Sequence, residues 1–428
     1  MPECFEGQVL TLSSEGQGIL RHHNLVVFVP FTAPGDSVQY TIVHQKKNFA
    51  QGKLLEVLDP SPHRTMPLCR YYGACGGCQL QHMTYEAQLE SKRQIIEDAL
   101  RRIGKITDVS IPPVIPAKLN WAYRRHITLK IRPEGDTLVA GYIAVDNHSL
   151  IPVQHCPIFI PESDPSIQQV QSLLKNLSSN GFAIGSAILF KTESGQMILS
   201  LNFEKEIEFD AEIMANFLKQ YPQWMGVCIH AGEKKWAWGN CQSIITVNEM
   251  RFVCSPNVFT QNHPEQSLKI YQQISQIVAS KPKAKVLDLY CGIGITSLLI
   301  AKQGRDVIGV EYNKESIELA QENARMNYLS TVRFIQGDVD HVLRQQLKKK
   351  IPDIIVVNPP RTGLTPVVID EILKRRPQEI LYVSCMPSTL ARDLQQLCSK
   401  DYKLSFVQPY DMFPQTNHVE TLVHLTRM

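Results

Sequence analysis

A thiol and a carboxylate near the C-terminus each stand beside an apolar run. Cys385 comes shortly after the run 379–383, and Glu420 directly precedes the run 421–425. Short apolar runs of this kind predict buried strands. A thiolate can act as a nucleophile and a carboxylate as a general base, so we interpret the two residues as a catalytic pair. Two alternatives stay open. Cys385 could be a core cysteine, and His418 could be the base, because the pKa of a free histidine, about 6.5, suits proton transfer.

A loop with two glycines predicts a cofactor site upstream of this pair. Gly292 and Gly294 follow a predicted strand at 285–289, and their lack of a side chain lets the backbone approach a ligand closely. Glu311 ends the next predicted strand about 20 residues further on, where a carboxylate can accept hydrogen bonds from ribose hydroxyls. Asp338 and Asn358 follow two later strands. Ligands bind at the carboxyl ends of parallel strands, so these residues should lie together.

The segment from about 266 onward alternates predicted strands and helices, which indicates a parallel α/β sheet. Its loop 288–294 differs from the GxGxxG pattern of dinucleotide-binding folds. The loop resembles the DxxxGxG loop of class I methyltransferases that bind S-adenosylmethionine. The resemblance implies that Tyr290 packs on the adenine or the methionine part and that Asp338 receives the adenine amino group.

A methyl donor beside a thiol and a carboxylate indicates chemistry on a pyrimidine. Uracil C5 is too poor a nucleophile to take a methyl group directly, but a thiolate that adds to C6 gives C5 the character of a carbanion. After methyl transfer a base must remove the C5 proton so that the thiol can leave. We expect Cys385 and Glu420 to perform these two roles. A stacked base cannot react in this way, so the target must be unpaired or flipped out.

Four cysteines form a second candidate site. Cys75 and Cys78 stand three residues apart around two glycines, Cys69 comes six residues before Cys75, and Cys156 lies much further on. Four thiolates suit tetrahedral zinc or an iron–sulfur cluster. Zinc sites more often contain two CxxC pairs, so one tight pair with two separate cysteines favours a [4Fe–4S] cluster. The alternative is four unrelated thiols, since free cysteine is often simply buried.

The N-terminal segment 1–58 predicts a small OB-like β-barrel, because short strand patterns alternate with turn residues. Lys46, Lys47 and Phe49 combine two cations with an aromatic ring, which suits RNA binding. The segment 121–126, with two aromatic residues, two arginines and a histidine, is a second candidate RNA contact. Both patterns are equally compatible with ordinary solvated turns and strand ends.

The composition indicates a soluble protein with several domains. The chain has 428 residues, of which 43% are hydrophobic and 20% charged, and its net charge of +3 permits RNA binding without requiring it. Its first residues lack the apolar core of a targeting signal, and no run is long enough for a membrane span. Its 11 cysteines then fit a reducing cytosol. We expect a cytoplasmic monomer with no membrane contact.

The stretches 384–393 and 411–420 resemble the two signatures of the RNA uracil-5-methyltransferase family, whose members modify 23S rRNA or tRNA. The resemblance extends over nearly the whole chain and implies that Cys385 is the nucleophile and Glu420 the base. The segment 259–261 resembles the family's F-x-Q segment, which implies that Gln261 contacts S-adenosylmethionine. The four cysteines match the [4Fe–4S] ligands of the rRNA branch, so 23S rRNA is the expected substrate.

The same resemblance divides the chain into three parts. It implies a TRAM barrel at 1–58, a central α+β domain with the cluster at 69–87 and 121–255, and a Rossmann-like, S-adenosylmethionine-dependent domain at 88–120 and 256–428. The chain departs from the family at Asn358, where Asp is usual, and at Ile295, where some members have a polar residue. The first departure puts a contact to substrate or cofactor in doubt.

Other functions fit parts of the sequence. The run Asn-Pro-Pro at 358–360 also resembles the motif of exocyclic amino N-methyltransferases, whose chemistry needs no thiol. A tRNA uracil-5-methyltransferase would keep the mechanism and change the substrate. An RNA-binding assembly factor with an inactive cofactor fold is the non-enzymatic alternative.

Overall fold

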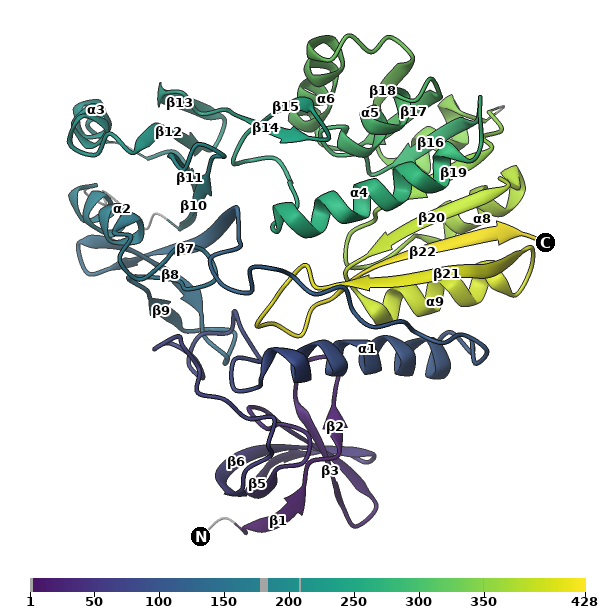
Figure 1. Ribbon diagram of the computed structural model, residues 1–428. Coiled ribbons are helices and arrows are strands. Elements are labelled where there is room, and N and C mark those ends of the chain that lie inside the picture. The colour runs from purple at the N-terminus through teal and green to yellow at the C-terminus, as the bar shows by residue number, and fades with distance from the viewer. Residues whose placement is uncertain (1–2, 178–183, 208, 349) are drawn as a thin grey trace.

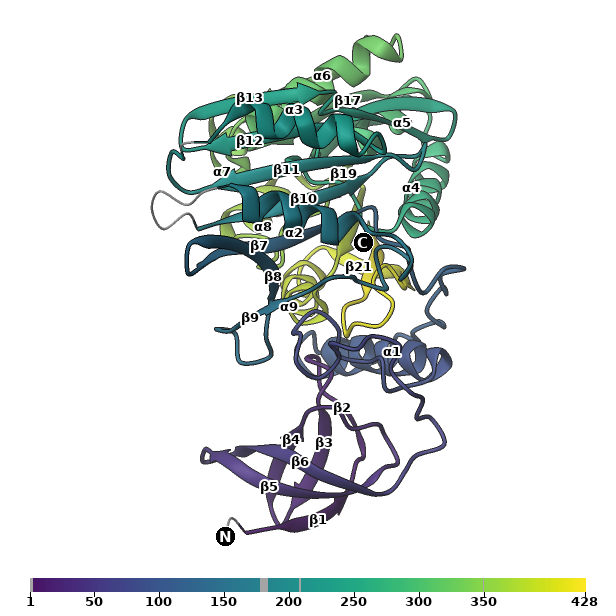
Figure 2. The same ribbon diagram turned by 90° about the vertical axis from the view of Figure 1, so that its left-hand side faces the viewer.

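The computed structural model describes residues 3–177, 184–207, 209–348 and 350–428. Figure 1 shows the N-terminal strands at the bottom, a mixed sheet at the left and an α/β domain, formed by the C-terminal sheet and its helices, at the right. Helix α1 (Tyr85–Arg102) lies between the N-terminal strands and the α/β domain. Figure 2 presents the mixed sheet face-on.

The N-terminal strands form a curled six-stranded sheet of order β1-β5-β6-β4-β3-β2. Its core consists of alternating apolar residues such as Leu20, Val27 and Val38, all of them fully buried. The barrel predicted from the sequence is therefore confirmed. The strands are β1 (Phe5–Gln8), β2 (Thr11–Leu12), β3 (Gly18–His22), β4 (Leu25–Val29), β5 (Ser37–Gln45) and β6 (Phe49–Asp59).

Helix α1 is amphipathic, with one apolar face buried. The Thr84 hydroxyl accepts a hydrogen bond from the Ala87 N–H and caps the first turn. Ile96 and Leu100 are buried in a core shared with Leu390 of helix α9 (Pro387–Cys398). The N-terminal strands thus reach the α/β domain through this helix.

The middle of the chain forms a second seven-stranded sheet of order β13-β12-β11-β10-β7-β8-β9. Two helices, α2 (Ser166–Asn176) and α3 (Ala211–Gln220), share its core. Two of its strands, β10 and β11, pair in antiparallel orientation. The strands are β7 (His126–Glu134), β8 (Thr137–Ile143), β9 (Leu150–Pro152), β10 (Gly185–Lys191), β11 (Met197–Phe203), β12 (Trp224–Ala231) and β13 (Lys234–Gly239).

The α/β domain contains a seven-stranded sheet of order β18-β17-β16-β19-β20-β22-β21. The first five strands in this order are parallel, and β22 and β21 are antiparallel to their neighbours. This is the parallel sheet that the alternating pattern predicts. The strands are β16 (Lys285–Leu289), β17 (Asp306–Glu311), β18 (Val332–Gln336), β19 (Ile354–Val357), β20 (Glu379–Ser384), β21 (Tyr402–Tyr410) and β22 (Glu420–Arg427), and a separate hairpin, β14 (Ser243–Val247) with β15 (Met250–Cys254), precedes them.

Helices cover both faces of this sheet. Helix α4 packs on one face, whereas α1, α8 and α9 share the core on the other. The helices are α4 (Pro264–Ala279), α5 (Ile295–Ala301), α6 (Lys314–Met326), α7 (Val339–His341) and α8 (Pro366–Arg375), and a π-helical turn, η1 (Val342–Gln346), follows α7. Across the part of the chain that the structure describes, no helix is long and apolar enough to cross a membrane.

The loop 411–419, between β21 and β22, is tied to every other part of the molecule. The Lys92 Nζ donates to Asp411 Oδ1 at 2.6 Å and to the Phe413 carbonyl at 3.0 Å, and both charged side chains are fully buried. The Gln415 N–H donates to Gln88 Oε1 at 3.0 Å, and Gln88 Nε2 donates to Gln415 Oε1 at the same distance. We name this segment the anchored loop.

Further hydrogen bonds join the anchored loop to the N-terminal half of the chain. The Tyr123 hydroxyl donates to the Pro414 carbonyl at 3.0 Å. The Leu80 N–H donates to the Gln415 carbonyl at 3.0 Å, and Asn417 Nδ2 donates to the Ser14 carbonyl at 2.7 Å. Segments about 300 to 400 residues apart in sequence therefore fix one another here.

Replacing Lys92 by Met should lower the free energy of unfolding by about 3–5 kcal/mol, because the buried Asp411 carboxylate would lose its counter-charge. Urea denaturation measures this change. The control is Arg93→Ala on the same helix, which removes exposed pairs with Glu90 and Glu97 and should cost less than about 1 kcal/mol. Equal effects of the two substitutions would show that the buried pair does not hold the anchored loop.

Candidate active site

Strand pairing brings the predicted nucleophile and base together. Strand β20 is antiparallel to β22, and the last pair in their register is Ser384 with Thr421. One step further along the same register, Cys385 stands opposite Glu420. Side chains directly opposite each other on antiparallel strands have Cβ atoms about 5 Å apart. The two residues are thus neighbours although 35 positions separate them in the sequence.

A guanidinium group lies beside this pair. Arg361 forms a hydrogen bond with the Cys385 thiol that favours the thiolate, and its charge also favours the ionised form of Glu420. Arg361 Nη2 lies 3.0 Å from His418 Nε2 and must be the donor, because arginine has no acceptor. His418 therefore uses the Nε2 lone pair to accept this hydrogen bond.

Burial dominates the protonation of the site. It raises the pKa of the Glu420 carboxyl to about 8, and Arg361 opposes this shift. Burial also raises the pKa of the Cys385 thiol to about 11, with a further contribution from the Glu420 charge. In contrast, burial and the Arg361 charge lower the pKa of His418 to about 4. His418 is therefore neutral at pH 7 and a weak base.

Helix α9 positions the turn that carries Arg361. The Arg361 carbonyl accepts a hydrogen bond from the Thr389 hydroxyl at 3.1 Å. Asp393 Oδ2 accepts from the Leu364 N–H and from the Tyr382 hydroxyl, both at 2.8 Å. The turn after β19 is thereby held against the end of β20, next to the thiol.

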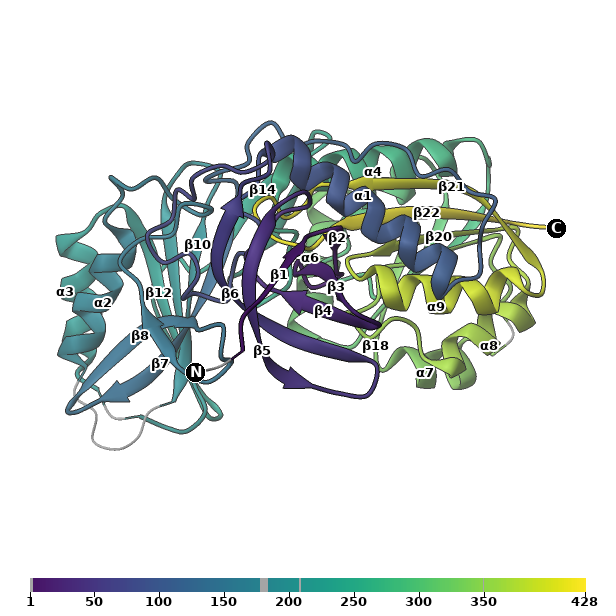
Figure 3. The same cartoon turned by 90° about the horizontal axis from the view of Figure 1, so that it is seen from below.

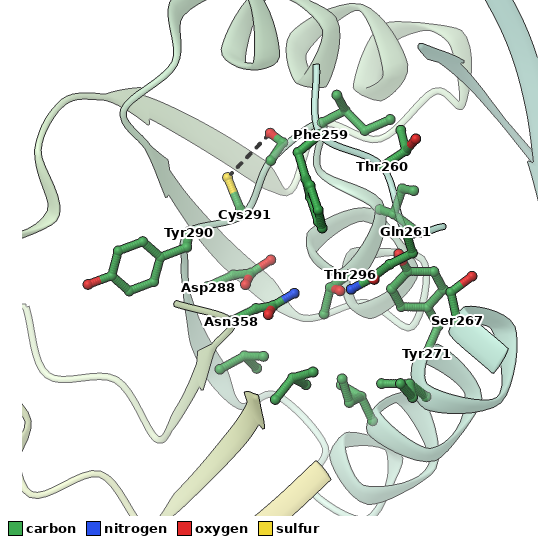
Figure 4. A pocket seen from close by; sticks show the side chains of 17 residues that line it. Phe259, Thr260, Gln261, Ser267, Tyr271, Asp288, Tyr290, Cys291, Thr296 and Asn358 are labelled. Carbon is green, nitrogen blue, oxygen red and sulfur yellow. Dashed lines mark hydrogen bonds between the residues drawn. The ribbon is translucent and has the colours of Figure 1, made fainter. Parts of the chain in front are cut away.

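The cofactor loop borders a pocket of about 620 Å³ in front of β16 and β19. Of the predicted ligands, Gln261, Tyr290, Gly292 and Asn358 line it. Figure 4 shows Gln261 and Asn358 directed into the pocket and the Tyr290 ring directed away from them. Tyr290 has a φ of 64°, a left-handed conformation that is rare for residues other than glycine.

The pocket and the nucleophile share strand β20. Val383 lines the pocket, and Cys385 stands two residues later. Cys385 stands in the bend after β20, two residues from this wall of the pocket. A methyl group bound in the pocket would therefore lie close to the segment that carries the thiol.

The other three predicted ligands lie outside the lining of this pocket. Gly294 has a φ of 82°, and a Cβ there would come within 2.7 Å of the Phe334 ring, so it shapes the loop. Glu311 accepts a hydrogen bond from the Gly292 N–H at 3.1 Å and fixes the loop by its carboxylate. Asp338 is exposed and accepts from the His341 N–H at 3.0 Å, as the cap of α7.

Several further lining residues were not predicted as ligands from the sequence. Asp288 is buried and accepts a hydrogen bond from the Ser297 hydroxyl at 2.5 Å, and burial raises its pKa to about 7. Tyr271 and Thr296 also line the pocket. The Phe259 ring points into the pocket and is 64% exposed, which leaves a large apolar surface for a ligand to cover. Among these residues only Asp288 and Phe259 belong to motifs that the sequence offers.

The four candidate metal ligands gather in one place. Cys69, Cys75, Cys78 and Cys156 line a single pocket beside the mixed sheet, together with Arg124 and Tyr142. Within the residues that the structure describes, no three His, Cys, Asp or Glu side chains are grouped closely enough to hold a single metal ion. The [4Fe–4S] cluster stays a prediction.

Comparisons with known proteins agree with these features. Residues 84–428 match the family model of tRNA (Uracil-5-)-methyltransferase. Residues 5–63 match the model of the TRAM domain of tRNA (uracil(54)-C(5))-methyltransferase. The N-terminal barrel is thus a TRAM domain, and the α/β domain has the fold of S-adenosylmethionine-dependent methyltransferases.

Similar proteins match the chain from end to end. An uncharacterized RNA methyltransferase of Protochlamydia amoebophila is 45% identical, with 99% of this chain and 98% of that protein covered. Another, from Halalkalibacterium halodurans, is 32% identical, with 99% and 97% covered. The solved tRNA (uracil-54, C5)-methyltransferase of Pyrococcus abyssi, in complex with S-adenosyl-L-homocysteine, has a TM-score of 0.77, 24% identity, and coverage of 99% of this chain and 100% of that one. The chain belongs to the S-adenosylmethionine-dependent RNA uracil-5-methyltransferase family.

Proposed function

We propose that this protein methylates C5 of a uridine in RNA, with Cys385 as nucleophile and Glu420 as base. The observation that carries the proposal is the strand register that sets the thiol opposite the carboxylate, with Arg361 beside both. The cofactor pocket close to the segment that carries the thiol adds support. S-adenosylmethionine, held by Gln261, Asn358 and the glycine loop, supplies the methyl group.

The protein's own groups account for the remaining steps. Once Cys385 has lost its proton to water, the thiolate sulfur forms a bond to C6 and places the electron pair of the C5–C6 double bond on C5. C5 then takes the methyl group, and S-adenosylhomocysteine is the leaving group. Glu420 then removes the C5 proton, the C5–C6 double bond re-forms, and the sulfur leaves. Arg361 favours both the thiolate and the carboxylate, so it supports the reactive form of each group. His418 accepts the Arg361 hydrogen bond and orients it, which makes His418 a less suitable base than Glu420.

We take 23S rRNA as the first substrate to test, because the four cysteines match the cluster ligands of the rRNA branch. A tRNA is the second candidate, since the matching family models and the solved P. abyssi structure are named for tRNA enzymes. Purified protein with isotopically labelled S-adenosylmethionine and unmodified total RNA distinguishes them. Label in 5-methyluridine from rRNA supports the first candidate, and label in tRNA supports the second.

Two substitutions should stop the reaction at different steps. Cys385→Ala should abolish methyl transfer and the covalent adduct with 5-fluorouridine RNA. Glu420→Gln should still transfer the methyl group but release product about 10²–10⁴ times more slowly, so that a covalent RNA–protein species builds up on uridine RNA. Denaturing gels and nucleoside mass spectrometry measure both effects.

The control for these variants is Cys398→Ala, which removes a half-buried thiol on α9 and should leave methylation intact. Full activity of Cys385→Ala, or label in a methylated amino group, would instead favour the amino N-methyltransferase alternative. Binding of S-adenosylmethionine without label in any nucleoside would favour the assembly factor.

The rate of product release should depend on pH through Glu420. Its pKa of about 8 means that the carboxyl is mostly protonated at pH 7 and becomes a base as the pH rises. Release should therefore increase with pH, reach half of its maximum near pH 8, and level off above that pH. Arg361→Met should move this inflection to higher pH, because Arg361 lowers the pKa of both Glu420 and Cys385.

Single-turnover assays between about pH 6 and 9.5 measure this profile, because the range extends on both sides of the raised Glu420 pKa of about 8 and lies above the ordinary carboxyl pKa. The exposed Arg376, at the other end of the sheet, provides the control substitution Arg376→Met, which should keep the wild-type profile. An unchanged inflection in Arg361→Met would remove Arg361 from this role.

We also propose that the four cysteines hold a [4Fe–4S] cluster with a structural role. The donor set fits: burial raises the pKa of Cys75 to about 11 and of Cys78 to about 12, so these thiols ionise most readily when bound to a metal. Four cysteine thiolates are the usual ligands of a [4Fe–4S] cluster. The reaction above is redox-neutral, so the protein needs no electron from the cluster.

Protein purified without oxygen should be brown and contain about four irons per chain. Cys78→Ala should lose the iron and weaken RNA binding or folding more than it weakens S-adenosylmethionine binding. Iron analysis, absorbance spectra and calorimetry measure these outcomes. A colourless protein that contains zinc would contradict the cluster assignment.

A further inference from the structure

A strongly basic cleft lies on the α/β domain, away from the active site. It has a volume of about 990 Å³ and opens between α8 and the segment that follows η1. Five cations and one carboxylate give its lining a net charge of +4, whereas the whole chain carries only +3. The residues that line it, here called the basic cleft, are Arg344, Lys348, Lys350, Ile351, Glu371, Lys374 and Arg375.

One buried guanidinium in the lining lacks a partner at one nitrogen. The Arg375 side chain is 5% exposed, pairs with Glu371 through Nη1 and donates to the Leu343 carbonyl through Nη2 at 2.7 Å. Its Nε is buried and has no hydrogen-bond partner among the described residues. An unpaired buried donor costs about 1–3 kcal/mol, so the Arg375 guanidinium keeps an unused hydrogen-bond donor in the wall of the cleft.

The rim of the cleft carries cationic side chains without a partner among the described residues. Arg344, Lys348 and Lys350 are exposed and form no ion pair or side-chain hydrogen bond with other described residues. Lys374 is partly neutralised, because its Nζ lies 3.1 Å from Glu371 Oε1. Three long cationic side chains are thus free to reach an anion.

The shape of the cleft favours an extended polyanion over a small ligand. Small-molecule sites are enclosed and mostly apolar. Here the rim is open, and Ile351, which is 71% exposed, is the one apolar residue in the lining. Cations spaced along two chain segments suit successive phosphates of a nucleic-acid backbone, where each contact also releases bound counterions.

The position of the cleft indicates which part of an RNA could reach it. Helix α8 runs back from the turn that carries Arg361, and its 10 residues span about 15 Å. The cleft therefore lies near the opposite edge of the sheet from Cys385, too far for the target nucleotide itself. Helix α8 shares a core with α1, and the TRAM domain rests on α1. Figure 3 shows α8 and the TRAM domain from below.

We propose that the basic cleft binds backbone phosphates of the substrate RNA at a distance from the target uridine. This inference rests on the proposed function, since it assumes an RNA substrate. It makes the cleft a means of selecting large, folded RNA over short oligonucleotides that contain a uridine.

The double variant Lys348→Glu/Lys350→Glu tests the proposal, because both side chains are exposed and lie outside the catalytic machinery. Its affinity for an unmodified 23S rRNA transcript should fall about tenfold or more, and the slope of log K against log salt should decrease by about two, one for each lost phosphate contact. Its affinity for a short single-stranded RNA with one uridine should match that of the wild type.

The matched control is Lys400→Glu/Lys403→Glu, which reverses two exposed lysines of the same domain outside the cleft. Thermal unfolding confirms that each variant is folded, and Arg344→Gln gives a milder second test with a slope change of about one. The proposal is wrong if the transcript affinity changes no more than in the control, or if the short RNA is weakened equally. Failure of wild-type protein to methylate any RNA would instead overturn the proposed function.

Discussion

The antiparallel pairing of β22 with β20 is the constraint on which the rest of the site depends. In a purely parallel sheet, only residues that follow their strands would meet at this end of the sheet. The residue at the start of a strand, such as Glu420, would lie at the opposite end from Cys385. The reversal at β21 and β22 does so for Cys385 and Glu420. In this arrangement the proposed base, Glu420, directly follows the anchored loop. The buried Lys92–Asp411 pair and the reciprocal Gln88–Gln415 hydrogen bonds then fix that loop against helix α1.

Burial and the Arg361 charge together determine the protonation of Cys385, Glu420 and His418. Without Arg361, the low-dielectric surroundings would favour a neutral thiol and a neutral carboxyl even more strongly. The Arg361 guanidinium can stabilise a negative charge on Cys385 or on Glu420, but one positive charge cannot fully balance both negative charges. At pH 7 the thiol and most of the carboxyl are therefore neutral, so the Arg361 guanidinium leaves the free site with a positive charge. The neutral His418, which accepts an Arg361 hydrogen bond, adds orientation without competing charge.

Local patterns in the sequence predicted much of the fold and part of the site. Helix α1, strands β20 and β22 and the glycine loop follow from apolar periodicity and turn residues, which act over short distances. The roles of Glu311 and Asp338 were harder to predict. A carboxylate after a strand can contact a ligand or accept a hydrogen bond from the backbone of a neighbouring loop, and the sequence does not distinguish the two. In this structure both accept backbone hydrogen bonds. Gln88 and Lys92 could be suspected only as polar residues on the apolar face of a helix. Their partners lie more than 300 residues away, where no local pattern reaches.

The amide at position 358 is consistent with the same electrostatic balance. Asn358 directly follows β19, whose Val357 pairs with Tyr382, so it is level with Val383 and lines the cofactor pocket with it. With ordinary strand spacing its Cα lies about 8 Å from that of Cys385. A carboxylate at this position would add a negative charge near the thiol and the Glu420 carboxyl, and would raise both pKa values further. An amide keeps the hydrogen-bonding groups without that charge. On the proposed mechanism, an amide in place of the family's usual aspartate would therefore ease the ionisation of Cys385 and Glu420.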